Sequence, residues 1–202
     1  MGTKERKERE KLEMQQKILD AARELFMKDG YENVSIRKIA EKIEYSPGTI
    51  YLYYKSKGQI FFVLCFLAFD AFYAEQIKAD DITDPLEKLK ESGKIYIRFA
   101  VENPEYFELM FLMKAPLEDY YDEITSDVSH KSFDYLKENI QECINAGYFK
   151  GYDLMTATIS TWAFVHGLAS LYIKDRLKKM SGRELDDFIE NALDLYLESA
   201  KK

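Results

Sequence analysis

The sequence of 202 residues contains few of the residues that break helices or cross-link small domains, with nine Gly, four Pro and two Cys. So little Gly and Pro excludes collagen-like and Gly/Ser-rich sequence and favours long helices. Cys65 and Cys143 are too few for a disulfide scaffold or a four-cysteine zinc site, which favours a reducing compartment. Hydrophobic residues make up 47% of the chain, which excludes a disordered protein.

Long apolar runs are also missing. The longest extends from Ile60 to Phe69, about half of the roughly 20 residues that a membrane-spanning helix needs. The first residues, Met1 to Lys11, form an alternating charge run without the apolar region of a signal peptide. We therefore expect a cytoplasmic protein without a membrane segment.

Motifs for catalysis or cofactor binding are absent from the sequence. There are only two histidines, His130 and His166, no cysteine near either at a useful spacing, no Gly-rich phosphate loop and no His-Glu-x-x-His helix. The acidic residues around 118–123 are typical of a solvated helix face. We expect no enzyme activity, no metal and no cofactor.

The net charge of −7 at first argues against a nucleic-acid partner, because phosphates attract basic surfaces. The charge is unevenly distributed, however, since residues 1–60 carry a net charge of +3 and residues 61–202 carry −10. The pattern therefore predicts a small basic head on an acidic body.

The hydrophobic pattern predicts an all-α protein. Ile18, Ala22 and Phe26 recur on one helix face, and Gly30 is placed to end that helix as a left-handed cap. A second helix follows over residues 36–43, and Ser46-Pro47 reads as the start of a third. Ser56 with Gln59 forms the capping box of a fourth. This fourth helix is expected to extend over 56–79. Further helices are expected near 84–101, 104–113, 117–146, 153–177 and 182–200.

The second and third helices have helix-turn-helix spacing. On a helical wheel Ile50 and Tyr54 face the core, whereas Gly48, Thr49, Tyr51 and Leu52 point outward. Such a surface suits a helix that reads the major groove of DNA. A helical hairpin with ordinary packing has the same pattern, and the pattern by itself leaves this alternative open.

These residues resemble the tetracycline-repressor (TetR/AcrR-like) family of transcriptional regulators. The matching stretch covers Ile18 to about Ile60, including Ser35-Ile-Arg-Lys-Ile-Ala and Ser46-Pro-Gly-Thr-Ile-Tyr-Leu-Tyr-Tyr. The resemblance implies a homodimeric DNA-binding repressor with a three-helix head on a helical ligand-binding and dimerisation body. By matching position, it implies DNA contacts from Ser35, Arg37, Ser46, Pro47, Gly48, Thr49, Tyr51, Tyr53 and Lys57.

The sequence departs from the family at the turn between the two helices. The family usually has Gly where this chain has Glu44, and a small aliphatic residue where it has Tyr45. It also commonly has Phe in place of Tyr54 and an acidic residue in place of Gly58. A non-Gly residue in a tight turn is uncommon, and a carboxylate there weakens local attraction to phosphate.

The body carries a second, weaker match to a subgroup with a Trp…His-Gly motif, here Trp162 and His166-Gly167. Trp162 and His166 are one helical turn apart and share a face. One interpretation makes them the wall of an effector pocket, and the other makes them core residues. The predicted pocket for a small hydrophobic or aromatic effector is lined by Phe66, Tyr96, Phe107, Phe111, Trp162 and His166.

We therefore predict a DNA-binding domain over residues 1–55 and an effector-binding and dimerisation domain over 56–202. The expected function is a ligand-responsive repressor that binds a palindromic operator as a homodimer formed by the last two helices. The alternative is a helical protein-interaction module that uses the charged N-terminal run as its arm.

Overall fold

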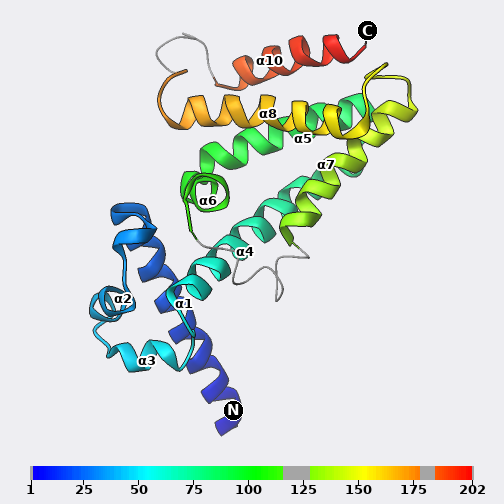
Figure 1. The fold of residues 1–202 in the computed structure, drawn as a ribbon. Coiled ribbons are helices and arrows are strands. Elements are labelled where there is room, and N and C mark those ends of the chain that lie inside the picture. The colour runs from blue at the N-terminus through cyan, green and yellow to red at the C-terminus, as the bar shows by residue number, and fades with distance from the viewer. Residues whose placement is uncertain (1, 116–127, 178–184, 202) are drawn as a thin grey trace. The chain divides into compact units, whose positions relative to one another are not determined.

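The computed structural model describes residues 2–115, 128–177 and 185–201 (Figure 1). These residues form helices and connecting loops without any strand, which confirms the all-α class. Two compact units can be distinguished. We call the described residues up to Ala68, with those from Phe107 to Ala115, the head; Phe69–Tyr106 and the described residues from Val128 onward are the body. The functional boundary predicted between residues 55 and 56 stays a prediction.

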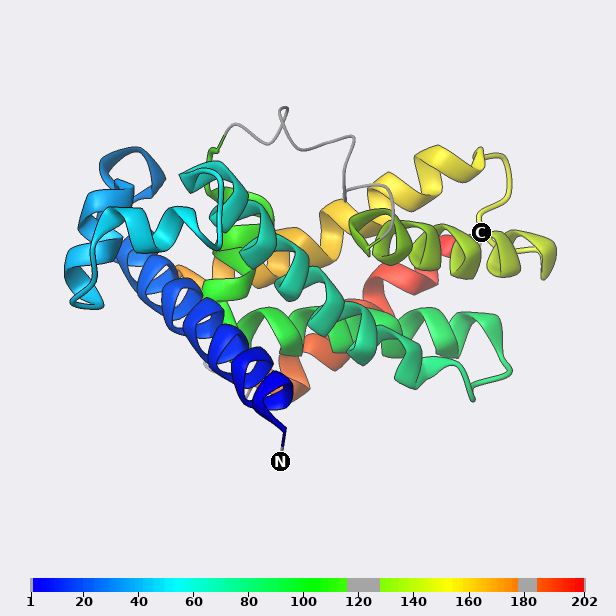
Figure 2. The same ribbon diagram turned by 90° about the horizontal axis from the view of Figure 1, so that it is seen from below.

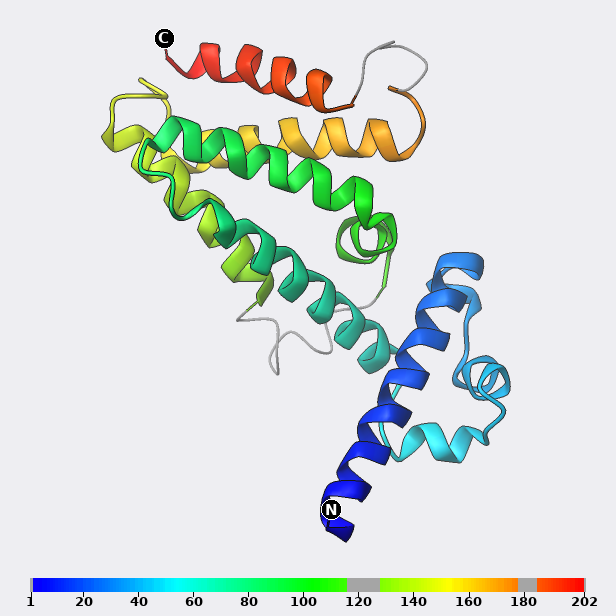
Figure 3. The same cartoon turned by 180° about the vertical axis from the view of Figure 1, so that it is seen from behind.

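The head begins with the 27-residue helix α1 (Thr3–Asp29), followed by η1 (Tyr31–Asn33), α2 (Ile36–Lys42) and α3 (Pro47–Tyr51). In Figure 3, α2 and α3 lie beside α1. Ile18, Ala22 and Phe26 are fully buried on the predicted face of α1. The ring of Phe26 packs edge-on against Phe61, and Tyr31 contacts both rings. This aromatic centre joins α1 to η1 and to the helix that follows α3.

The helix ends follow their capping residues. Ser46 accepts a hydrogen bond from the third residue of α3, as predicted, and Ser35 accepts one from the third residue of α2. Ser56 accepts from the backbone N–H of Gln59, as the predicted cap requires, and Oε1 of Gln59 accepts from the backbone N–H of Lys55. Gly30 ends α1 with a positive φ of 78°, but its ψ of 152° is extended rather than left-handed helical. The chain therefore leaves α1 abruptly and enters η1.

Helix α4 (Lys57–Gln76) contributes residues to both units, because their boundary falls after Ala68. It continues into η2 (Ile77–Ala79). By length and composition alone, the stretch Lys57–Ala79 and the later helix Leu154–Ile173 reach what a membrane span requires. This is weak support for a span, since a core helix of a soluble protein meets the same criterion.

The body is built around α5 (Pro85–Glu102), which packs against α7 (Val128–Asn145), α8 (Leu154–Ile173) and α10 (Leu185–Ala200). Figure 2 shows these helices from below. A Cβ at Gly93 would lie 2.8 Å from the Leu193 side chain, so glycine allows α5 and α10 to approach closely. Lys90 pairs with Glu190 and Asp194, each at 2.5 Å, and joins the same two helices electrostatically.

The bounds of α5 agree with the predicted helix near 84–101, whereas the helix expected over 104–113 is divided into two elements. Asp84 caps α5 through the backbone N–H groups of Leu86 and Glu87, and Asn103 ends it before α6 (Pro104–Phe107). A π-helical turn, η3 (Glu108–Leu112), follows α6. The expected helix starts at 117 and 182 lie outside the described residues. Both cysteines are buried and free.

Candidate nucleic-acid interface and effector site

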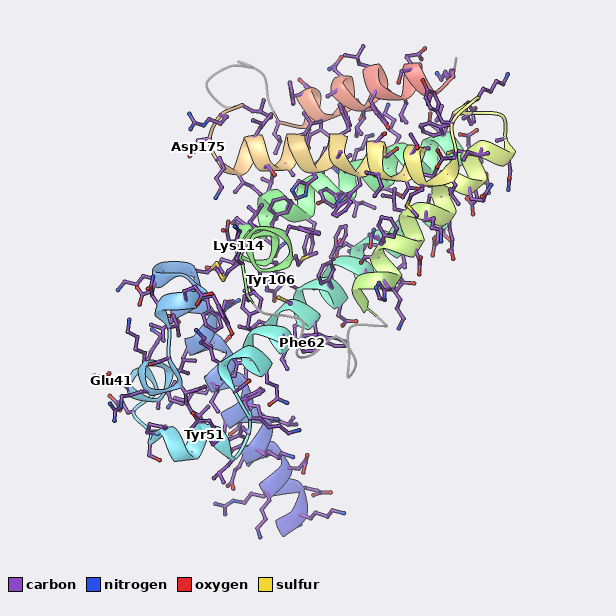
Figure 4. All side chains as sticks on the ribbon, in the orientation of Figure 1. Glu41, Tyr51, Phe62, Tyr106, Lys114 and Asp175 are labelled. Carbon is purple, nitrogen blue, oxygen red and sulfur yellow. The ribbon has the colours of Figure 1, made fainter. Side chains whose placement is uncertain are left out.

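The short helix α3 separates a buried side from an exposed one. Ile50 is fully buried and Tyr54 is 5% exposed, whereas Tyr51 is 56% and Leu52 is 81% exposed. Gly48 is exposed as well, and Thr49 is half-buried. Figure 4 shows Tyr51 on this helix. The outward residues leave an exposed face with a small residue, a hydroxyl and an alkyl group, which are the groups that contact base edges and thymine methyls.

The remaining predicted contact residues surround the start of α2 and α3. Ser35, Arg37, Ser46 and Pro47 are exposed, and Tyr53 is half-buried. The two serine hydroxyls cap their helices, which leaves the N-terminal backbone N–H groups oriented for an anion. Among the α2 cations in the described residues, Lys38 and Lys42 pair with Asp29 and Glu24 of α1.

Lys57 differs from the other predicted contacts because it is anchored inside the head. Its ammonium donates a hydrogen bond to the carbonyl oxygen of Tyr31 at 2.8 Å and lies 4.0 Å from the centre of the Tyr31 ring. Burial lowers the pKa of Lys57, and the charge of Glu32 opposes this. An ammonium has three N–H donors, so two are left for other acceptors, including a phosphate.

The turn between α2 and α3 contains the departures from the family pattern. Glu44 has a φ of +62°, the left-handed region in which Gly is the usual residue. Tyr45 is 43% exposed, and the ammonium of Lys17 lies 4.9 Å from the centre of its ring. Sequence reasoning missed Tyr45 as part of this surface, because the exposure of a turn residue depends on how the two helices cross.

Three of the predicted effector residues meet inside the body. The Tyr96 hydroxyl lies 2.9 Å from Nδ1 of His166, and Nε1 of Trp162 donates to the same hydroxyl at 3.3 Å. Burial raises the pKa of Tyr96 and lowers the pKa of His166, so both groups are neutral near pH 7. With Trp162 donating to it, the Tyr96 hydroxyl can direct its proton to Nδ1, which leaves His166 protonated at Nε2.

Aromatic rings extend this group, which we call the aromatic cluster. Phe72 packs against Tyr96 at 5.3 Å between ring centres, and Phe133 packs against Trp162 at 6.1 Å. Phe133 was missed from the sequence, because nothing in its local pattern distinguishes it from core packing. Phe107 and Phe111 contact each other at 5.3 Å within the head, which also contains Phe66.

Two buried polar side chains lie on the elements that carry these rings. Gln76, one turn after Phe72, donates from Nε2 to the backbone oxygen of Ser132 at 3.3 Å. Both residues are 6% exposed, and the Gln76 Oε1 and Ser132 Oγ atoms have no hydrogen-bond partner among the described residues. A buried polar atom without a partner is rare and costly.

The comparisons with known proteins identify both parts of the chain. Residues 18–64 match the family described as bacterial regulatory proteins, tetR family, and residues 89–196 match the tetracyclin repressor-like C-terminal domain. The chain belongs to the TetR family. The resemblance seen in the sequence is thereby confirmed. The residues that match the N-terminal family model, 18–64, include both α2 and α3.

Curated relatives and solved structures agree with this assignment. An HTH-type transcriptional regulator of Staphylococcus aureus is 31% identical over 94 residues, and an uncharacterized HTH-type transcriptional regulator of Haemophilus influenzae is 30% identical over 95 residues. These alignments cover 46% of this chain and about half of each relative, 50% and 51%.

Two solved TetR-like structures share the fold over almost the whole chain. PfmR, a TetR family regulator from Thermus thermophilus, is 20% identical with a TM-score of 0.70, covering 92% of this chain and 99% of its own. FadR from Bacillus subtilis, in complex with stearoyl-CoA, is 20% identical with a TM-score of 0.73, covering 91% and 98%. At this identity the likeness shows the fold alone.

Proposed function

We propose that this TetR-family protein is a cytoplasmic, ligand-responsive transcriptional repressor that binds a palindromic operator as a homodimer. A small hydrophobic or aromatic effector releases it from the DNA. The two-sided helix α3 is the observation that carries the DNA-binding part, since Ile50 is buried while Tyr51 and Leu52 are exposed. The protein acts by binding and not as an enzyme.

In this proposal α3 enters the major groove and the surrounding residues contact phosphates. Gly48 lets the backbone approach the DNA, and Thr49 or Leu52 contacts a thymine methyl. The helix N-termini behind Ser35 and Ser46 favour phosphate through their free N–H groups. The full set of proposed contacts is Ser35, Arg37, Ser46, Pro47, Gly48, Thr49, Tyr51, Tyr53 and Lys57.

The proposed dimer interface lies on the last two helices. Three apolar residues of α8, Met155, Ile159 and Leu171, are 43–49% exposed, and Leu195 of α10 is 78% exposed. Val165, by contrast, is buried in the body at 4% exposure and is not available to a partner. The exposed apolar residues of α8 and α10 are therefore the support for a four-helix interface between two copies.

The proposed effector site is the aromatic cluster around Tyr96, Trp162 and His166 within the body, whereas the other residues predicted to line it, Phe66, Phe107 and Phe111, belong to the head. Apolar rings with a few polar groups are typical of ligand sites. Two half-sites one DNA turn apart require recognition helices about 34 Å apart. An effector releases the operator if it binds more tightly to the state in which this spacing is lost. The operator affinity then falls by the difference between the effector's binding free energies for the two states.

Selection of bound duplexes from a random pool tests the DNA-binding proposal. We expect a two-fold symmetric sequence, and the Tyr51→Ala/Leu52→Ala variant should lose at least tenfold in affinity for it, since each good base contact contributes about 1–3 kcal/mol. Tyr152→Ala is the matched control, because Tyr152 is 64% exposed and lies in the body. Retained binding by the α3 variant would favour the interaction-module alternative.

Effector release is tested with stearoyl-CoA, the ligand of the FadR structure, and with a set of aromatic acids as probes. Trp162 is the only tryptophan of the chain, so its fluorescence reports on the aromatic cluster directly. A true effector changes this fluorescence and releases the selected operator at the same concentration. Saturated protein that holds its operator with unchanged affinity would contradict the release mechanism.

A further inference from the structure

The N-terminal half of α1 is a helix without a covering partner in the described residues. Residues 4–13 are all exposed, although the same helix buries Ile18 and Ala22 completely further along. Figures 1, 2 and 3 show the first turns of α1 extending beyond the other helices of the head. Apart from Leu12, which is 58% exposed, this segment is polar on every side, and such a helix needs side-chain pairs or an external partner to be maintained.

Charges are sorted by face along this segment. Arg6 pairs with Glu10 at 2.7 Å and Arg9 pairs with Glu13 at 3.5 Å. These i,i+4 pairs support the helix and neutralise one side of it. The paired arginines are therefore charge-balanced and have no reason to attract a further anion.

The opposite side carries Lys4, Lys7 and Lys11, which we call the lysine face. At 3.6 residues per turn these positions lie within an arc of about 60°. None of the three makes an ion pair within the described part of the chain, and all three are exposed. Glu8 borders this face and leaves it with a net positive charge.

The lysine face lies on the same side of α1 as Ile18 and Ala22. Further along the helix, that side packs against the rest of the head. The residue type on this side thus changes from apolar to lysine where α1 leaves the cover of α2 and α3. The three lysines span about 10 Å along the helix axis, which matches about three phosphates of one DNA strand at 3.4 Å each. Lys17, further along α1, lies over Tyr45 in the turn between α2 and α3.

We propose that the lysine face binds the phosphate backbone of duplex DNA beside the site read by α3. Binding there is independent of sequence and strengthens each head on its half-site by releasing counterions. This inference rests on the proposed DNA-binding function, to which it adds a second contact region in the same head. It also explains why the charged N-terminal run carries lysines on this face, since the helix does not need them in order to form.

The test compares two double variants with the same charge change in the same segment. Lys4→Ala/Lys7→Ala removes two residues of the lysine face, and Arg6→Ala/Arg9→Ala removes the two paired arginines. Binding to a mixed-sequence duplex and to the selected operator is measured between about 50 and 200 mM salt. Circular dichroism of both variants checks that the helix is kept.

For the lysine variant we expect the slope of log K against log salt to fall in magnitude by about 0.9 for each phosphate that is no longer neutralised. The arginine variant should keep the wild-type slope. The proposal would be overturned if the lysine variant had the same slope as wild type, or if both variants lost the same amount of slope. The lysine face would then have no specific role in binding DNA. Wild-type protein without salt-dependent DNA binding would instead refute the proposed function itself.

Discussion

The ammonium of Lys57 holds Tyr31 at two points, by a hydrogen bond of 2.8 Å to its carbonyl oxygen and by a 4.0 Å approach to its ring centre. Tyr31 in turn packs against Phe26 of α1 and Phe61 of α4. Lys57 is therefore a structural residue of the head as well as a proposed phosphate contact.

Replacing Lys57 by Ala should lower the free energy of unfolding by about 1–2 kcal/mol, because the variant loses both a charged hydrogen bond and the approach to the ring. Urea denaturation measures this loss. Lys55→Ala is the control, since Lys55 is exposed and its removal should change stability by less than about 0.5 kcal/mol. Equal stability of the two variants would mean that the Tyr31 contact contributes nothing.

Replacing Glu44 by Gly should stabilise the head by about 0.5–1 kcal/mol, because a residue with a Cβ is strained at a φ of +62°. Glu44→Gln keeps the strain and removes only the charge, so it should leave stability near wild type. Both variants should bind DNA more tightly at low salt, because a carboxylate beside the proposed interface is gone. A Gln variant as stable as the Gly variant would assign the gain to charge and not to the backbone.

Replacing Ser132 by Ala should raise the free energy of unfolding of the effector-free protein by about 1 kcal/mol, since its buried hydroxyl has no partner among the described residues. Ser160→Ala on the exposed side of α8 corrects for the higher helix propensity of Ala. Thermal and urea denaturation of the two variants provide the comparison. A less stable Ser132→Ala protein would mean that the hydroxyl is satisfied in solution, for instance by water.

Acid should destabilise the body through His166, whose pKa burial lowers below its ordinary value. As the pH falls below about 6.5, the unfolded chain binds a proton at this residue while the folded body does not. The contribution of neutral His166 is therefore complete above this pH and is lost as the pH falls through the lower, folded-state pKa. His166→Gln keeps a polar partner for Tyr96 and should have a flatter stability profile between about pH 7.5 and about pH 5.5. If the stabilities of wild type and His166→Gln changed with pH in parallel, protonation of His166 would not be the cause of the acid destabilisation.

Much of the head could be predicted because its signals are local. The cap at Ser46, the buried Ile50 and the exposed Tyr51 each depend on residues within one or two helical turns. The predicted cap at Ser56 forms for the same reason, because the backbone N–H of Gln59 lies within one helical turn of it.

The proposed effector site was less accessible to sequence reasoning. The spacing of Trp162 and His166 indicates a shared face, but the hydroxyl that joins them comes from Tyr96 on another helix. Phe133 and Ser132 come from α7, and no local pattern points to their partners. Such contacts depend on how α5, α7 and α8 cross.

The sequence by itself determined the all-α class, the helix-turn-helix, the family and the basic head on an acidic body, because periodicity, caps and charge are properties of neighbouring residues. Only the tertiary structure decided that Lys57 anchors Tyr31, that Tyr96 joins Trp162 to His166, and that the lysine face is uncovered. Each of these depends on whether residues distant in sequence come within contact distance. That distance is set by helix packing, which the pattern of any single helix does not contain.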